Sequence, residues 1–594
     1  MPNNIDRREF IKVAGAAVVG ASAANHPASA LGADGKGPAA LIFKGGPIVT
    51  MVDGGPEVQA VAVSDGRILA AGSEADIMLL ANDKTKIIDL KGATLMPSFI
   101  DAHGHFMNAP QLVTWANVSG VPVGPIKSIK DFVPVLQEHV KKLNIKPGEW
   151  IVGYGYDGTT LSDGRELSRD DLDPAFPDNP VMLMHVSNHG CVMNSKAFEW
   201  AKMDASTETP AGGIILRKKG SNEPDGLIME QAFAPVFANW PKPTEEDLLN
   251  NMAGAQQIYA SVGVTTCQEG GSHAADIKFL QTAAEKGLLY LDVVSLPFVM
   301  DVPAMVAEYF PSFVSEKKHE LPDTAAEHFG TYKNRLKFAG IKIPTDGSPQ
   351  GKTAFWTKPL LTPGPSGEKD WRGAPLFPPE LVNKAVAEFF KKGVRIYVHC
   401  NGDASIDMVI DAVRAAGITA KDDRRTVIIH SQFMRPDQLD AYVELGLTPS
   451  FFTEHCYFWG DVHIENTGIE RASFISPMAS AKAKGIRFSN HNDFSVTPME
   501  PMRQMWSAMK RETRSGKILG PNERIDAMTA LKAMTIDAAW QILEENSKGT
   551  IEVGKLADLV ILDANPLTTE VDKIVDIAVV ETFKEGNSVY KKAG

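Results

Sequence analysis

The sequence predicts an α/β protein: a (β/α)₈ TIM barrel with a large insertion after its first strand, plus a small β-sandwich formed by both termini. Three observations predict this fold. Apolar strand-like runs alternate with amphipathic helical stretches through the long middle of the chain, as in parallel α/β proteins. Short β-like runs with glycine-rich turns stand at both ends, and neither end has enough of them to bury a core alone. The length of 594 residues also exceeds that of a single ordinary core.

Residues 1–30 resemble a twin-arginine export signal. Arg7-Arg8 stands in a charged start, residues 13–24 are small and apolar, and Ala28-Ser29-Ala30 has the form of a cleavage site. The alternative is a stray arginine pair before an alanine-rich helix. No other stretch reaches the roughly 18 consecutive apolar residues of a transmembrane helix. We therefore expect a signal peptide, export by the Tat machinery, and a soluble mature protein in the periplasm.

Residues 31–97 and 548–594 are expected to supply the two parts of the β-sandwich. Ala40-Leu41-Ile42-Phe43 is strand-like at the first end, and Ala557-Asp558-Leu559-Val560-Ile561-Leu562-Asp563 is strand-like at the second. The long segment 98–547 is then inserted between the two parts.

The apolar runs within residues 98–547 predict eight principal barrel strands. Reactive side chains of such a barrel lie at the carboxyl ends of its strands. An excess of roughly 150 residues, at 106–255, separates the first two strands and should form a lid or cap beside the site. The strands are expected to end near His105, Glu269, Val299, Lys342, His399, His430, Thr453 and Asp493.

The composition matches an average soluble protein, with 44% hydrophobic and 22% charged residues. The net charge of -13 argues against nucleic-acid binding and gives no reason to expect attraction to an anionic membrane. A small-molecule substrate fits better. The 4 cysteines show no C-x-x-C spacing, so neither a zinc knuckle nor a dense disulfide framework is indicated. Free buried thiols are the default, and one disulfide stays open in an oxidising compartment.

The most informative motif is Asp101-Ala102-His103-Gly104-His105, which closes an apolar run. Residues i and i+2 of a strand point the same way, so His103 and His105 can share one divalent cation. Taken alone, the two histidines would more often merely flank a glycine in a turn.

Four more candidate ligands stand at predicted strand ends, and their order carries the argument. Lys342 ends the fourth strand, His399 the fifth, His430 the sixth and Asp493 the eighth. Each alone has an ordinary explanation, such as a helix cap or the start of a turn. Together, in this order and register, they predict one metal site at the barrel mouth.

These motifs resemble those of the amidohydrolase superfamily, specifically the amidohydrolase 3 or YtcJ-like branch, which includes N-substituted formamide deformylases. The resemblance covers nearly everything after the signal. The motifs that carry it are Asp101-Ala102-His103-Gly104-His105, Gly263-Val264-Thr265-Thr266, Lys342-Ile343-Pro344-Thr345-Asp346-Gly347-Ser348, His399-Cys400-Asn401-Gly402-Asp403 and Gly554-Lys555-Leu556-Ala557-Asp558-Leu559-Val560.

The resemblance implies a site for divalent metal, in the first place two zinc ions per chain. His103 and His105 would hold one ion together with Asp493, while His399 and His430 would hold the other. The resemblance thus implies which residues would bind each ion.

In many relatives the lysine at the place of Lys342 is carboxylated, and the resulting carbamate bridges the two metals. The alternative is a single metal beside an unmodified Lys342.

The resemblance also implies the reaction, which is hydrolysis of a C–N bond of an amide, formamide, carbamate or cyclic amide by a metal-bound hydroxide. Asp493 would be catalytic: it would accept the water's proton and pass it to the leaving amine. The alternatives are an esterase or lactonase on the same scaffold, or a catalytically inactive secreted binding protein.

Four residues are candidates for substrate contacts. His189 and Asn194 lie in the insertion and could equally be loop structure. His491 could contact substrate, act as a further ligand, or orient the loop. Trp459 belongs to an aromatic stretch after the seventh strand that could line a pocket or form core under the cap. No sequence feature selects a symmetry, so a homodimer stays open.

Overall fold

The structure is a computed structural model that describes residues 37–186, 190–210, 213–241, 243–302, 326, 329–364 and 367–593. The chain is a mixed α/β protein, as predicted. The expected signal at residues 1–30 lies outside the described residues. It therefore stays a prediction.

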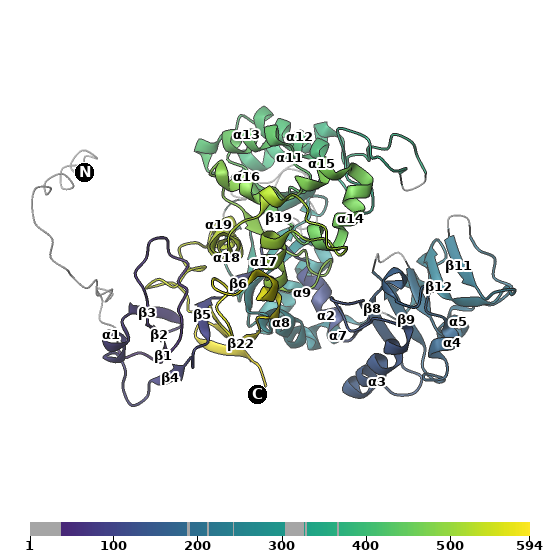
Figure 1. Cartoon of the computed structure of the whole chain (residues 1–594), viewed down its shortest axis with the longest axis horizontal. Helices are drawn as coiled ribbons and strands as arrows, with labels where there is room; N and C mark the ends of the chain where they lie inside the picture. The colour runs from purple at the N-terminus through teal and green to yellow at the C-terminus, as the bar shows by residue number, and fades with distance from the viewer. Residues whose placement is uncertain are drawn as a thin grey trace, which may run out of the picture.

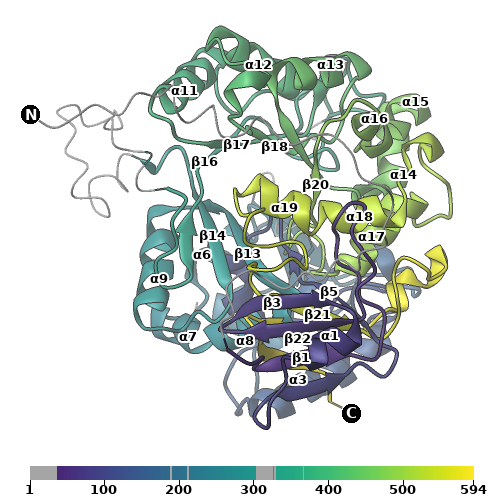
Figure 2. The ribbon, with the colours of Figure 1, turned by 90° about the vertical axis from the view of Figure 1, so that its left-hand side faces the viewer.

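Two four-stranded sheets, one from the first part of the described chain and one mainly from its last part, pack together (Figure 2). Their orders are β3-β2-β1-β4 and β23-β22-β21-β5. Apolar side chains of both sheets share one core, in which the rings of Phe43 and Phe583 lie 5.1 Å apart. The strands are β1 (Leu41–Lys44), β2 (Ala60–Ser64), β3 (Arg67–Gly72), β4 (Lys86–Asp89), β5 (Thr94–Pro97), β21 (Leu559–Leu562), β22 (Val579–Lys584) and β23 (Asn587–Lys591).

Two further sheets are wholly parallel and follow the order of the sequence, β6-β13-β14-β15 and β16-β17-β18-β19-β20. Nearly all residues of these strands are buried, as expected for parallel strands covered on both faces. The strands are β6 (Phe99–Ile100), β13 (Val264–Ser272), β14 (Asp292–Pro297), β15 (Leu336–Phe338), β16 (Ile341–Pro344), β17 (Ile396–Cys400), β18 (Val427–His430), β19 (Thr448–Phe451) and β20 (Ser489–Asn490).

Backbone contacts join the parallel strands beyond these pairings. Phe298, just after β14, forms a parallel bridge with Lys342 in β16. At the other edge, the N–H of Asp493 donates to the carbonyl of His103 at 3.2 Å, and the N–H of His105 donates to the carbonyl of Phe494 at 2.5 Å. The segments that follow β6 and β20 are therefore in direct backbone contact.

Helices alternate with the parallel strands, and in Figure 2 α11, α12 and α13 lie outside β16, β17 and β18. Helix α11 has Val382, Val386 and Phe389 buried on one side, which is the spacing of an amphipathic helix. The helices that follow the parallel strands are α9 (Ala274–Glu285), α11 (Pro379–Lys391), α12 (Asp403–Ala415), α13 (Pro436–Leu445), α14 (His455–Thr467), α15 (Ile469–Ser473), α16 (Met478–Ala483), α17 (Pro501–Lys510), α18 (Ala527–Ala533) and α19 (Ile536–Gln541).

Between β6 and β13 the chain forms a separate six-stranded sheet, β11-β12-β10-β9-β8-β7, which projects to one side in Figure 1. It has its own apolar cores, one of them built around Phe132 and Tyr156. Its strands are β7 (Ala116–Asn117), β8 (Ile151–Tyr156), β9 (Val181–His185), β10 (Gly190–Met193), β11 (Gly213–Arg217) and β12 (Pro224–Glu230). Its main helices are α3 (Phe132–Leu143), α4 (Arg169–Leu172) and α5 (Ser195–Ala201), and α7 (Glu245–Asn250) and α8 (Met252–Ala260) lead back to β13.

The first predicted strand differs most from the structure. Regular pairing ends at Ile100, so His103 and His105 follow the strand in a turn rather than lying on its face. Gly104 explains the turn, because a Cβ there would lie 2.6 Å from the carboxylate oxygen Oδ2 of Asp101. The absence of a side chain at Gly104 lets the chain fold over Asp101.

None of the helices in the described ranges has the length and apolarity needed to cross a membrane. The four cysteines are free and buried, as expected for structural thiols.

Candidate metal centre

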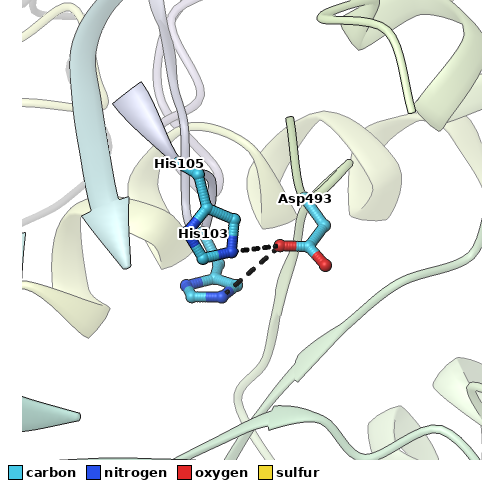
Figure 3. Close-up of side chains that lie close together, drawn as sticks. All are labelled: His103, His105 and Asp493. Carbon is cyan, nitrogen blue, oxygen red and sulfur yellow. Dashed lines mark ion pairs between the residues drawn. The ribbon is translucent and has the colours of Figure 1, made fainter. Parts of the chain in front are cut away.

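The side chains of His103, His105 and Asp493 converge on one point (Figure 3). Oδ1 of Asp493 lies 3.5 Å from Nε2 of His103 and 3.3 Å from Nε2 of His105. Two ligands of one tetrahedral zinc ion, each bound at about 2.0–2.1 Å, are about 3.4 Å apart. The three donor atoms are therefore spaced as ligands of one cation.

The chemistry of this donor set also fits a cation. Oδ1 of Asp493 is buried, and no hydrogen bond of good geometry reaches it in the described chain, although the imidazole of His105 lies 3.3 Å away. A buried carboxylate oxygen without a donor is costly, and a divalent cation would satisfy it. Asp493 also has a positive φ of 52° and His430 one of 71°, which are sparsely populated backbone conformations for residues other than glycine. Such strain is often found at functional sites.

Two residues in the middle of β13, Gln268 and Glu269, which were not among the predicted site residues, contact the histidines on the side away from Asp493. Oε1 of Gln268 lies 2.9 Å from Nδ1 of His103, so an N–H at Nδ1 leaves the lone pair on Nε2 free toward Asp493. Oε1 of Glu269 lies 3.7 Å from Nδ1 of His105. Glu269 is itself held by the N–H groups of Met107 at 2.7 Å and Gly271 at 3.2 Å.

The predicted strand end near Glu269 was the signal that could have found both residues. Side chains at the carboxyl end of one barrel strand lie near those at the carboxyl ends of the neighbouring strands, where the candidate ligands are.

Lys342 is buried beside the first group of ligands. Its Nζ lies 3.0 Å from Nε2 of His103. Burial lowers the pKa of Lys342 to about 8, although the carboxylates of Asp493 and Glu269 oppose this shift. A substantial fraction of this amine is therefore neutral near pH 8.

His399 and His430 form a second pair. Nδ1 of His399 and Nε2 of His430 lie 3.1 Å apart. On its far side, Nε2 of His399 is 3.5 Å from Oδ1 of Asp346, whose carboxylate accepts backbone N–H groups from Phe355, Asn401 and Gly402. Nδ1 of His399 and Nε2 of His430 therefore point toward each other, as two ligands of a second cation would.

His491 supports that pair from behind. Its Nε2 lies 3.0 Å from Nδ1 of His430, and its Nδ1 lies 3.0 Å from Oγ of Ser450. The side chain is buried, and both ring nitrogens already have partners. Of the alternatives for His491, these contacts favour the one in which it orients other parts of the site.

Charge divides these histidines into two kinds. Burial lowers the pKa of His399 to about 4 and that of His491 to about 3. Burial and the nearby Lys342 ammonium lower the pKa of His103 well below its usual range. At His105 burial also disfavours the charged form, but Asp493 and Glu269 outweigh it and raise the pKa to about 10.

The other predicted substrate contacts are separated by the structure. Asn194 is completely buried in the insertion: its Oδ1 accepts the N–H groups of Val181 and Ala197, and its Nδ2 donates to the carbonyl of Asn179 at 2.9 Å. It therefore caps α5 rather than facing the metal centre, because its polar atoms are already satisfied locally. His189 lies outside the described residues.

Trp459 lines a cavity of about 680 Å³ between the insertion and the parallel strands. Asn108, three residues after His105, and Phe494, next to Asp493, line the same cavity. Its wall therefore begins beside the candidate metal ligands.

The chain is similar to known proteins over most of its length. The chain is 26% identical over 541 residues to the N-substituted formamide deformylase of Arthrobacter pascens, covering 90% of this chain and 95% of that protein. It is 24% identical to the amidohydrolase YtcJ of Bacillus subtilis, covering 93% of this chain and 99% of that protein. The crystal structure of an uncharacterized metal-dependent hydrolase from Pyrococcus furiosus shares the fold, with a TM-score of 0.66 and 23% identity over 89% of this chain and 100% of that one.

A family model described as the amidohydrolase family matches residues 86–590. That match spans nearly all of the described chain, and it includes every candidate ligand. The family predicted from the motifs is thereby confirmed: the chain belongs to the amidohydrolase family.

Proposed function

We propose that this protein is a metal-dependent hydrolase that cleaves the carbon–nitrogen bond of an amide-type substrate. The observation that carries the proposal is the buried Oδ1 of Asp493, which has no hydrogen-bond donor and faces Nε2 of both His103 and His105. Family membership and the similarity to the N-substituted formamide deformylase support the choice of bond.

His103, His105 and Asp493 would hold one divalent cation, and His399 and His430 a second. A divalent cation in such a site lowers the pKa of water and polarises a carbonyl oxygen. Zinc suits this set of imidazoles and one carboxylate.

We propose that Lys342 carries a carboxyl group in the active protein. Its neutral amine would attack carbon dioxide, forming an N–C bond and releasing one proton, which gives a carbamate with two oxygen donors. Burial favours this step because it lowers the pKa of Lys342 to about 8 and so increases the neutral fraction. An unmodified Lys342 beside a single cation is the competing form.

Asp493 would move the proton during hydrolysis. Amide cleavage needs a proton on the leaving nitrogen, because an amine anion is a very poor leaving group. Oδ1 of Asp493 faces the cation, so the other oxygen of the carboxylate, Oδ2, would accept the proton of the attacking water and deliver it to that nitrogen. His105, at 3.3 Å from Oδ1, would hold the carboxylate in position.

We also infer that the parallel strands form one (β/α)₈ barrel. The consecutive strand order, the bridge between Phe298 and Lys342, and the backbone hydrogen bonds between the segments after β6 and β20 support this inference. In that barrel all proposed ligands lie at one mouth.

The test is metal content by elemental analysis, together with hydrolysis of matched formamides, acetamides and esters before and after chelation. We expect about two metal ions per chain, preference for amides, and activity that is lost on chelation and restored by zinc. Asp493→Asn should lose both metal and activity. Asp440→Asn, an exposed carboxylate with 71% of its side chain accessible, is the matched control.

About one metal ion per chain would favour the form with unmodified Lys342. Absence of metal, and of activity after zinc is supplied, would contradict the proposal and favour a binding protein.

Export through the twin-arginine route is proposed as well, on the sequence of residues 1–30 alone. Replacement of Arg7-Arg8 by two lysines should leave the protein in the cytoplasmic fraction of a bacterial host. Periplasmic recovery of that variant would contradict the proposal.

A further inference from the structure

The cavity beside the metal centre is walled by aromatic side chains from both of its sides. Trp115, Tyr154 and Phe237 come from the insertion, and Phe458, Trp459 and Phe494 come from the segments after β19 and β20. Flat rings on two opposing walls suit a flat apolar group between them.

One cation stands on this wall without an anionic partner. The guanidinium of Arg514 lies 5.1 Å from the ring centroid of Phe458 and 5.9 Å from that of Tyr457. In the described part of the chain, no carboxylate pairs with it. Two carboxylates also line the cavity: Glu500, which is paired with Arg503 at 2.5 Å, and Asp157, which is not free either.

The loop that carries Arg514 is fixed in place. The N–H of Thr513 donates to the carbonyl of Lys517 at 2.8 Å, and the N–H of Ser515 donates to Oδ2 of Asp461 at 3.1 Å. The N–H of Arg514 itself donates to the carbonyl of Tyr457 at 3.3 Å. The guanidinium is therefore presented by an ordered backbone at the cavity rim.

From these contacts we propose that the substrate carries an aromatic substituent ending in a carboxylate. The ring occupies the space between the aromatic walls, and the carboxylate pairs with Arg514. This inference rests on the proposed function for the position of the reacting bond, which lies toward Asp493. It adds the substrate class.

A binding experiment tests the inference apart from catalysis. The probes are N-(4-carboxyphenethyl)acetamide and N-(4-methylphenethyl)acetamide, which differ in charge and little in size. Trp115 and Trp459 line the cavity, so quenching of tryptophan fluorescence reports binding there. We expect the carboxylated probe to bind roughly tenfold more tightly, as for one charge-assisted hydrogen bond at a partly exposed site.

Arg514→Gln should reduce this preference to about one, and Arg514→Lys should keep part of it. Arg524→Gln is the matched control, because Arg524 is exposed and lies outside the cavity lining. The preference should also shrink at high salt. Equal binding of both probes by the wild type, no binding of either, or an unchanged preference in Arg514→Gln would overturn the inference.

Hydrolysis of the two corresponding formamides by the zinc-loaded protein separates this inference from the proposed function. A binding preference without any hydrolysis would support an aromatic carboxylate as the ligand of this cavity and would contradict the proposed hydrolase. Hydrolysis without a binding preference would support the hydrolase and contradict the aromatic carboxylate.

Discussion

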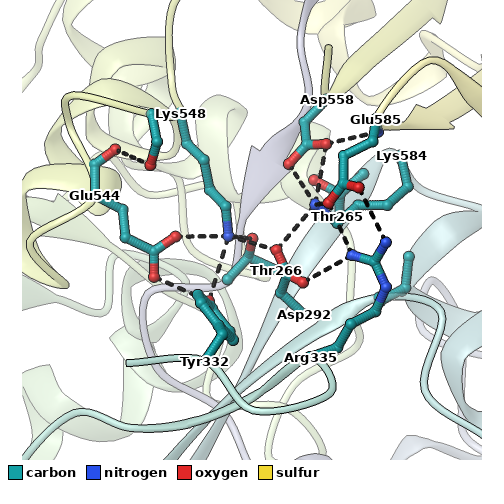
Figure 4. Close-up of polar contacts among 12 residues, drawn as sticks. Thr265, Thr266, Asp292, Tyr332, Arg335, Glu544, Lys548, Asp558, Lys584 and Glu585 are labelled. Atoms are coloured by element: carbon teal, nitrogen blue, oxygen red, sulfur yellow. Dashed lines mark hydrogen bonds and ion pairs between the residues drawn. The ribbon is translucent and has the colours of Figure 1, made fainter. Parts of the chain in front are cut away.

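Asp292 is the centre of a buried ionic cluster, and its replacement should destabilise the whole protein (Figure 4). Oδ2 of Asp292 lies 2.7 Å from Nζ of Lys548 and 2.9 Å from Nζ of Lys584, and Oδ1 lies 3.0 Å from the guanidinium of Arg335. Lys548 also donates to Oγ1 of Thr266 at 3.0 Å. The cluster thus ties β14 and β13 to β22 of the C-terminal sheet.

The change Asp292→Asn keeps the shape and removes the charge. Breaking a buried ion pair by removing one partner typically costs about 3–5 kcal/mol. Here each lysine keeps another carboxylate, Lys548 with Glu544 at 2.6 Å and Lys584 with Asp558 at 2.9 Å. We therefore expect a loss near the lower limit, about 3 kcal/mol in the free energy of unfolding.

Urea denaturation followed by tryptophan fluorescence measures this loss. Asp53→Asn is the control: Asp53 pairs with Lys532, but 90% of its side chain is exposed, so its removal should cost less than about 1 kcal/mol. Equal losses of unfolding free energy in the two variants would refute the reasoning, because the contribution of a carboxylate to stability would then not depend on its burial.

The pH dependence gives the same prediction a second readout. Burial raises the pKa of Asp292, but Lys548 and Lys584 outweigh it and hold that pKa below its usual range. A depressed carboxyl pKa contributes stability above the unfolded value of about 3.9 and loses it as the pH falls through the folded value. The gap between wild type and Asp292→Asn should stay constant from pH 7 to pH 5 and narrow below about pH 4.

Three further predictions concern the site and the insertion. Gln268→Leu removes the partner of His103 Nδ1 and should weaken zinc binding by about 10–100-fold in a chelator competition, whereas exposed Gln59→Leu should not. Zinc binding at pH 8 should release about one proton from His105, whose pKa is raised to about 10, and a pH-indicator titration without this release would contradict the assignment. Asn194→Ala should cost about 2 kcal/mol of stability, measured by denaturation, with unchanged metal content; a loss of metal would show that Asn194 acts on the site after all.

The resemblance of the motifs to a known family was sufficient to predict the family, and the order of the predicted strand ends was sufficient to predict that His103, His105 and Asp493 meet. His103, His105 and Asp493 could be brought together because each follows a buried parallel strand, and such strand ends share one edge of the sheet. The strand was predicted to continue to His105, with a turn at Gly104 as the alternative, because His103 and His105 follow the apolar run at i, i+2 spacing. In the structure regular pairing ends at Ile100, and the close approach of Asp101 to Gly104 fits the turn.

Partners that are far apart in sequence account for most of what sequence reasoning could not find. Gln268 contacts His103 although the two residues are 165 positions apart in the sequence, and no local sequence pattern predicts such a contact. Asn194 could not be assigned from local sequence either, because its residue type and its place in the insertion suit both a substrate contact and a helix cap. Its hydrogen bonds to neighbouring backbone groups show that it is a helix cap.

The electrostatics of the site act on cation binding in two opposite ways at neutral pH. His103, His399 and His430 have pKa values below the usual histidine range because burial disfavours their charged forms, so their rings are neutral and offer lone pairs. Of the four histidines, His105 is the one that is held protonated, by Asp493 and Glu269. A cation that binds at this point must displace that proton, and the raised pKa of His105 makes this displacement costly at neutral pH, so metal affinity should rise as the pH rises. The same arrangement explains why loss of Asp493 should be more damaging than loss of one histidine: it removes the only carboxylate that faces both His103 and His105 in the candidate metal cluster of the described chain.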